Sequence, residues 1–131
     1  MYRACEKQMS IYDYLPPYHG ELCNANRWVR LAAAIDWDGF EKAYSELFAP
    51  GGKVTLPARV ALGCRIIQLH YAASDREVVA LVQESPYLQY FLGFESFTDA
   101  VPFSSRTVAR FRARIPDKAV RPAVRLLRSF Q

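Results

Sequence analysis

The residues best suited to chemistry in this 131-residue chain are the arginines near its C-terminus. Eight basic residues lie between Ser104 and Gln131 with Asp117 as the only acidic one, so this segment carries a formal charge of +7. Residues 1–103 carry −3, which leaves the whole chain at +4. Guanidinium groups bind phosphates well, and a field of one sign attracts polyanions, most often nucleic acid. The charge distribution therefore favours a polyanion-binding surface at this end of the chain.

The spacing of these arginines predicts a stripe on one face of a helix. Arg106, Arg110 and Arg114 recur every four residues, while Val108 and Phe111 fall on the opposite, inward face. A solvated surface is the simpler interpretation of a charged helix face, but no acidic residue accompanies this stripe. Hydroxyl groups at the start of the helix and a second arginine series add further phosphate donors. The predicted DNA contacts are Ser104, Ser105, Arg106, Thr107, Arg110, Arg114, Arg121 and Arg125.

These charged segments need a scaffold, and the sequence places its centre at Leu56–Tyr71. Apolar residues recur there at helical spacing over most of the circumference, with three polar interruptions. The interruptions are Arg59, Arg65 and Gln68. A helix that is apolar nearly all round is buried among other helices. Thr55 is expected to cap it, and Pro57 to occupy its first turn, where no backbone N–H is needed.

Cap and turn residues predict further helices on both sides of this one. Ser74 and Glu77 have the spacing of a capping box, Pro86 suits the first turn of a short helix, and Gly93 suits its end. Two helices are expected before the central one, from Asn24 or Asn26 to Ile35 and from Asp36 or Asp38 to the turn at residues 49–52. Two more are expected near the C-terminus, from Ser104 or Ser105 to Ile115 and from Asp117 onward. In the last of these, Pro122 kinks the helix or delays its start.

The fold class predicted from these signals is all-α. No alternation with a period of two and no internal repeat is present, so neither a sheet nor a repeat architecture is expected. We expect an irregular arm over residues 1–24 and one domain over residues 25–131. That domain should hold five to seven helices with helix-turn-helix-like elements around the central one. The helices beginning near Ser74 and Ser104 are both candidates to enter a DNA groove.

Several functional classes have no support in the sequence. The apolar runs are too short to cross a membrane, and the N-terminus lacks the apolar core of a signal peptide. Three widely spaced cysteines, Cys5, Cys23 and Cys64, are expected to be free thiols in a reducing cytosol, with Cys64 in the core. His70 is expected to be a hydrogen-bonded core or boundary residue. Neither histidine has a suitable cysteine pair nearby, so no metal site is expected.

Four segments, in this order, carry a resemblance to a known family. They are the proline-led helix Leu56–Tyr71, Ser74-Asp75-Arg76-Glu77, Tyr90-Phe91-Leu92-Gly93-Phe94, and the segment from Ser104 to Ile115, which reads SSRTVARFRARI. Upstream of them, Trp28–Leu31 and Ile35–Trp37 resemble the same family. The chain from about residue 26 onward therefore resembles the N-terminal domain of insertion-sequence transposases of the InsH type. The resemblance implies an all-α, cytoplasmic, nucleoid-associated domain that binds double-stranded DNA at transposon ends.

The family resemblance also implies that catalysis resides elsewhere. In such transposases a following ribonuclease-H-like domain holds two divalent metals on Asp, Asp and Glu, which stabilise both oxygens of a phosphoryl displacement. This chain stops at Gln131, and its aspartates match none of those catalytic positions. We therefore expect a DNA-binding module that is not an enzyme by itself and has no cofactor of its own. The alternatives are a dimerisation module that pairs transposase subunits, with a homodimer as partner, or a truncated transposase remnant.

Overall fold

The structure, a computed structural model, describes residues 22–45 and 56–130. Seven helices and no extended strand occur in these residues, which confirms the predicted all-α class. The helices are α1 (Arg27–Ala34), α2 (Trp37–Ser45), α3 (Ala58–Tyr71), α4 (Asp75–Glu84), α5 (Pro86–Phe91), α6 (Ser105–Arg114) and α7 (Asp117–Ser129).

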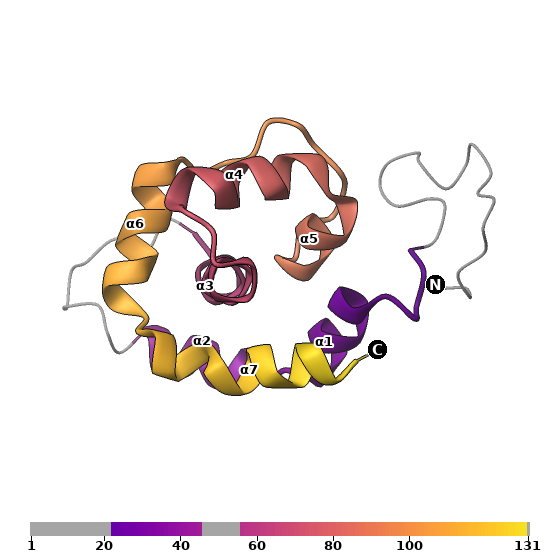
Figure 1. Cartoon of the computed structure of the whole chain (residues 1–131). Coiled ribbons are helices and arrows are strands. Elements are labelled where there is room, and N and C mark those ends of the chain that lie inside the picture. Colours follow the sequence, from indigo (N-terminus) through magenta and orange to yellow (C-terminus); the bar gives the residue numbers. More distant parts are fainter. Residues whose placement is uncertain (1–21, 46–55, 131) are drawn as a thin grey trace.

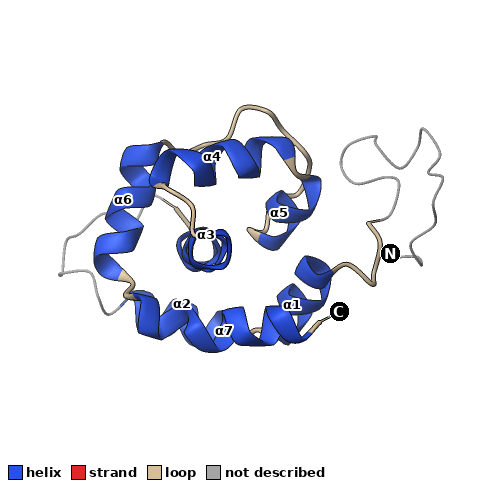
Figure 2. Cartoon of the chain, in the orientation of Figure 1, coloured by secondary structure: helices blue, strands red, loops and turns tan. Residues whose placement is uncertain are grey.

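The other helices surround α3, which Figure 1 shows end-on in the middle of the molecule. In that view α4 and α5 lie above it, α6 at the left, and α1, α2 and α7 below, all of them helical in Figure 2. Direct packing joins α3 to α2, α4, α6 and α7, and joins α4 to α6. The predicted central position of this helix is therefore confirmed.

The burial of α3 follows from its composition. Nearly every residue from Ala58 to Gln68 is buried, and Cys64, Ile66 and Ile67 are fully inaccessible to solvent. Helices on several sides cover its apolar surface, as expected for a helix without a polar face. Fully burying one such aliphatic side chain contributes about 1.5–3 kcal/mol, so α3 supplies much of the driving force for the fold.

Most helix boundaries lie where the cap residues predicted them. The Asn26 side chain accepts a hydrogen bond from the Trp28 N–H at 2.8 Å, which selects Asn26 over Asn24 as the start of α1. The two reciprocal bonds of the Ser74–Glu77 capping box are both present, at 3.0 and 3.1 Å. Gly93 follows α5 with a φ of +90°, a left-handed conformation that glycine adopts without steric cost. Local sequence therefore decides these termini.

Three other helix starts resolve alternatives that the sequence left open. The Asp36 carboxylate accepts a hydrogen bond from the Gly39 N–H at 3.1 Å, so Asp36, and not Asp38, precedes α2. Ser104 is the N-cap of α6, and its hydroxyl makes no capping bond to the backbone. Helix α7 begins at Asp117 and contains Pro122 in its interior, so this proline does not delay the helix.

The start of α3 differs from the prediction. Pro57 is the N-cap, with an extended ψ of 148°, and the helix begins at Ala58. The Pro57 carbonyl accepts from the N–H groups of Val60 and Ala61, so this residue serves as an acceptor before the first turn and is not part of that turn. Thr55, the predicted cap, and the turn at residues 49–52 lie outside the described residues, as does the arm up to residue 21.

Two predictions about cysteine and histidine need correction. Cys23 is disulfide-bonded, so the expectation of three free thiols is wrong at this position, whereas Cys64 is free and buried as predicted. His70 lies at the core boundary, edge-to-face with Trp28, and its Nδ1 is buried without a hydrogen-bond partner. Burial and the nearby Arg27 and Arg128 lower the pKa of His70. Packing against aromatic rings, rather than hydrogen bonding through Nδ1, holds this histidine.

A charge placed at the centre of α3 tests the assignment of the core. Ile67 is fully buried, so Ile67→Asp would place an unpaired carboxylate among apolar side chains, at a cost of several kcal/mol. We expect the variant to be unfolded by circular dichroism at room temperature. Ala80→Asp is the matched control, because Ala80 is exposed on α4 and the change costs about 0.7 kcal/mol in helix propensity. Equal melting temperatures for the two variants would show that α3 is not the core.

Candidate nucleic-acid interface

Helix α6 has one buried face and one strongly basic exposed face. Val108 and Phe111 are buried against the body, and Arg106, Arg110 and Arg114 all lie on the exposed side. Arg106 and Arg110 form no ion pair with the described residues. The helix carries four arginines and no acidic residue, so its charge is +4. The predicted stripe therefore faces solvent, while its contact with phosphates stays a prediction.

The start of α6 brings the predicted hydroxyl groups together. Ser104 is exposed, Ser105 and Thr107 are half-buried, and the Ser104 Oγ lies 3.5 Å from the Thr107 Oγ1. Because Ser104 makes no side-chain capping bond, the first N–H groups of α6 have no side-chain acceptor from it. Free N–H groups at a helix N-terminus, together with hydroxyl donors, are a favourable arrangement for an anion.

The second arginine series lies on α7, which follows α6 after only Ile115 and Pro116. Arg121 and Arg125 are exposed and form no ion pair with the described residues. Together with Leu69, Val124 and Arg128 they line a depression of about 220 Å³. The two predicted series therefore belong to consecutive helices joined by a short corner, and the geometry of that corner sets their relative direction.

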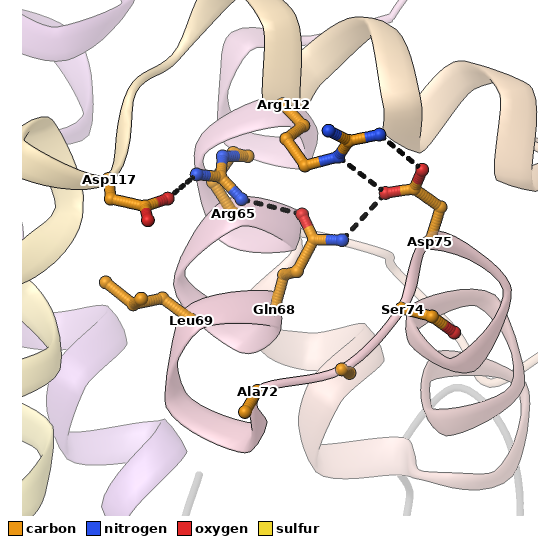
Figure 3. Close-up of a pocket in the computed structure, with 9 residues that line it drawn as sticks. Arg65, Gln68, Leu69, Ala72, Ser74, Asp75, Arg112 and Asp117 are labelled. Carbon is orange, nitrogen blue, oxygen red and sulfur yellow. Dashed lines mark hydrogen bonds and ion pairs between the residues drawn. The ribbon is translucent and has the colours of Figure 1, made fainter.

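A buried arginine from α3 holds this corner in place (Figure 3). The Arg65 side chain is 3% exposed, and its Nε donates to the carbonyl of Ile115 at 2.8 Å. Its Nη1 donates to Gln68 Oε1 at 2.6 Å, and its Nη2 pairs with the carboxylate of Asp117. Ile115 is the C-cap residue of α6, and Asp117 is the first residue of α7. One guanidinium therefore binds the carbonyl that follows one helix and the carboxylate that begins the next.

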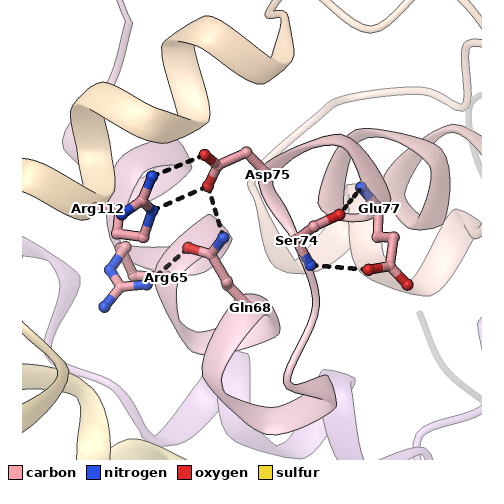
Figure 4. Close-up of polar contacts among 6 residues, drawn as sticks. All are labelled: Arg65, Gln68, Ser74, Asp75, Glu77 and Arg112. Atoms are coloured by element: carbon pink, nitrogen blue, oxygen red, sulfur yellow. Dashed lines mark hydrogen bonds and ion pairs between the residues drawn. The ribbon is translucent and has the colours of Figure 1, made fainter.

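The same polar network continues to α4 and back to α6 (Figure 4). Gln68 Nε2 donates to Asp75 Oδ1 at 2.7 Å. Arg112 on α6 donates to both oxygens of that carboxylate, from Nε at 3.1 Å and from Nη2 at 3.0 Å. These hydrogen bonds, first from Arg112 and then from Gln68, lower the pKa of Asp75. The network links α3, α4, α6 and α7 and borders a pocket of about 440 Å³.

Electrostatics separate the two helices that are candidates to enter a groove. Helix α4 carries Asp75, Arg76, Glu77 and Glu84, a formal charge of −2, whereas α6 carries +4. Helix α4 follows α3 after the short turn Ala72–Ser74, in which Ala72 has a left-handed φ of 52°. The acidic helix would repel a phosphate backbone that the basic one attracts. Of the two candidates, α6 has the suitable charge.

Sequence reasoning located the exposed arginines but missed the paired ones. Arg112 belongs to the same basic segment, yet it is committed to Asp75, which lies 37 residues earlier in the chain. Arg65 interrupted an apolar helix, and two of its three partners, Ile115 and Asp117, lie 50 and 52 residues away, where the local sequence gives no sign of them. The only available signal was the presence of an arginine in an otherwise apolar helix, because a buried charge requires a partner.

Two properties of the described residues bear on other functional classes. No group of three or more His, Cys, Asp or Glu side chains there is arranged to hold a metal ion. None of the helices in the described ranges has the length and apolar character needed to cross a membrane.

Comparisons with known proteins support the broader part of the resemblance, which is a transposase domain. A family model described as Transposase domain (DUF772) matches residues 11–114. The uncharacterized protein ORF8 in the nfe locus of Rhizobium meliloti is 36% identical over 87 residues. That match covers 66% of this chain and 42% of the Rhizobium protein, so the chain spans less than half the length of this relative. No solved structure shows a significant match.

The two arginine pairs of the network should contribute very differently to stability. Arg65→Met would leave the buried Ile115 carbonyl and the Gln68 amide oxygen without donors, at about 1–3 kcal/mol each. Arg112→Met would remove a pair whose arginine side chain is 55% exposed, which should cost at most about 1 kcal/mol. Urea unfolding would measure both free energies. If Arg112→Met lowered the free energy of unfolding as much as Arg65→Met, this result would contradict the structural role assigned to Arg65.

Proposed function

Because the chain belongs to the Transposase domain (DUF772) family, we propose that it is the DNA-binding module of an insertion-sequence transposase. In this proposal the module binds double-stranded DNA at transposon ends through α6 and α7, and the cleavage chemistry belongs to other parts of the transposase. The observation that carries the proposal is the exposed stripe Arg106, Arg110 and Arg114 on a helix of charge +4.

The shape of α6 supports insertion into a major groove. Ala113 is exposed beside the stripe and Ala109 is half-buried next to it, and their small side chains would allow close approach of the backbone to DNA. A major groove about 12 Å wide admits one α-helix, with the arginines of the stripe near the phosphates of one strand. Ser104, Ser105 and Thr107 would donate to a phosphate at the N-terminus of α6. Arg121 and Arg125 would contact the backbone beyond the corner.

The charge distribution favours DNA binding over a dimerisation role. Protein interfaces are depleted of charge at their centre and enriched in aromatic residues, methionine and arginine. The exposed face of α6 has arginines and small residues but no aromatic or methionine side chain. Arg106 and Arg110 are exposed and form no ion pair with the described residues, and exposed charges contribute little to stability, so binding is the better explanation for their presence on one face.

Neutralising the stripe tests the proposal. The variant Arg106→Gln, Arg110→Gln, Arg114→Gln preserves helix propensity and removes three charges. We expect the melting temperature to stay within a few degrees of the parent, because the side chains are exposed. In fluorescence anisotropy with a labelled duplex, the slope of log K against log salt should flatten by about 2.7, and the affinity at 0.1 M salt should fall about 500-fold.

A second triple variant removes the same charge from other surfaces. Arg30, Lys42 and Arg76 are exposed on α1, α2 and α4, and replacing all three by Gln gives the same net charge as the stripe variant. This control should retain most of the parent's affinity and slope. If both variants weaken binding equally, the general charge of the domain attracts DNA and α6 has no special role. If the stripe variant binds like the parent, the stripe is only a solvated surface.

A further inference from the structure

Asp75 occupies an unusual position between two helices of opposite charge. It is the first residue of α4, where the helix dipole favours a carboxylate, and its side chain reaches across to Arg112 on α6 (Figure 4). Arg112 donates two hydrogen bonds to the Asp75 carboxylate, at 3.0 and 3.1 Å, and Gln68 donates a third at 2.7 Å. All hydrogen bonds to this carboxylate therefore come from fixed positions on neighbouring helices.

Arg112 lies on a different flank of α6 from the exposed stripe. It is two positions away from both Arg110 and Arg114, which corresponds to about 200° of rotation around a helix with 3.6 residues per turn. The stripe therefore occupies one flank of α6, and Arg112 occupies the flank next to α4. A helix in the major groove has one DNA strand along each flank. Only one of these two flanks offers arginines that are not held by Asp75.

We propose that Asp75 is a specificity-determining residue that limits the number of phosphates contacted by α6, by holding Arg112 in an intramolecular pair. This inference rests on the proposed DNA-binding function. With Asp75 present, the phosphates of the second strand meet a neutral ion pair in place of a cation. The pair thereby lowers affinity for DNA of any sequence, because phosphate contacts carry no sequence information. A lower affinity for non-specific DNA increases the ratio of specific to non-specific affinity when the contacts to the bases are unchanged.

Removing the carboxylate charge releases Arg112 and tests the inference. Asp75→Asn should fold like the parent by circular dichroism; if it does not, Asp75→Ser replaces it, since serine is well tolerated at helix N-termini. With a labelled duplex of random sequence, the slope of log K against log salt should steepen by about 0.9, and affinity at 0.1 M salt should rise about 8-fold. Arg112→Gln alone should leave the parent's slope unchanged.

Two further variants separate release of Arg112 from a general change of charge. The double variant Asp75→Asn, Arg112→Gln should return to the parent's slope. Glu84→Gln removes an exposed carboxylate from the other end of the same helix and should not change the slope. An unchanged slope in Asp75→Asn, or a steeper slope that persists in the double variant, would overturn this inference alone. Failure of the parent to bind DNA would overturn the proposed function as well as the inference that rests on it.

Discussion

The arrangement of the domain depends on one buried cation, the guanidinium of Arg65 inside the otherwise apolar α3. An unpaired charge there would cost many kcal/mol, so its hydrogen-bonding groups must be supplied by the surrounding chain. They come from Gln68 on α3, from the last carbonyl before the corner at Ile115, and from Asp117 at the start of α7. The requirement to satisfy Arg65 therefore fixes where α6 ends and α7 begins, and with it the placement of both arginine series.

The apolar surface of α3 explains why the charges collect on the outside. Helices on several sides cover it, and each contributes its apolar stripe to the core, as Val108 of α6 and Val120 of α7 do. The remaining face of each helix is left for solvent or a partner. The outer face of α6 contains arginine and alanine, and that of α4 contains acidic residues. The same packing rule thus produces two adjacent helices whose surfaces favour different partners.

Much of this fold could be predicted from the sequence because local signals decide it. The capping box at Ser74 and Glu77, the glycine at position 93 and the apolar circumference of α3 act within a few residues, so their effects can be read from the chain. The distant partners of Arg65 and Arg112 could not be found in this way, because Ile115, Asp117 and Asp75 lie 37 to 52 residues away and only packing brings them together. The disulfide of Cys23 was missed because an odd number of widely spaced cysteines favoured free thiols.

The central claim is that this domain contacts several DNA phosphates through a fixed basic surface, and the most direct test is the salt dependence of duplex binding by the full parent chain. Each phosphate contact releases counterions and adds about −0.9 to the slope of log K against log salt. Three contacts from the stripe on α6 alone predict a slope of about −3 or steeper between low and moderate salt. A slope near zero, with or without measurable binding, would contradict the account, because a surface that recognises DNA through arginine and phosphate must weaken as salt rises.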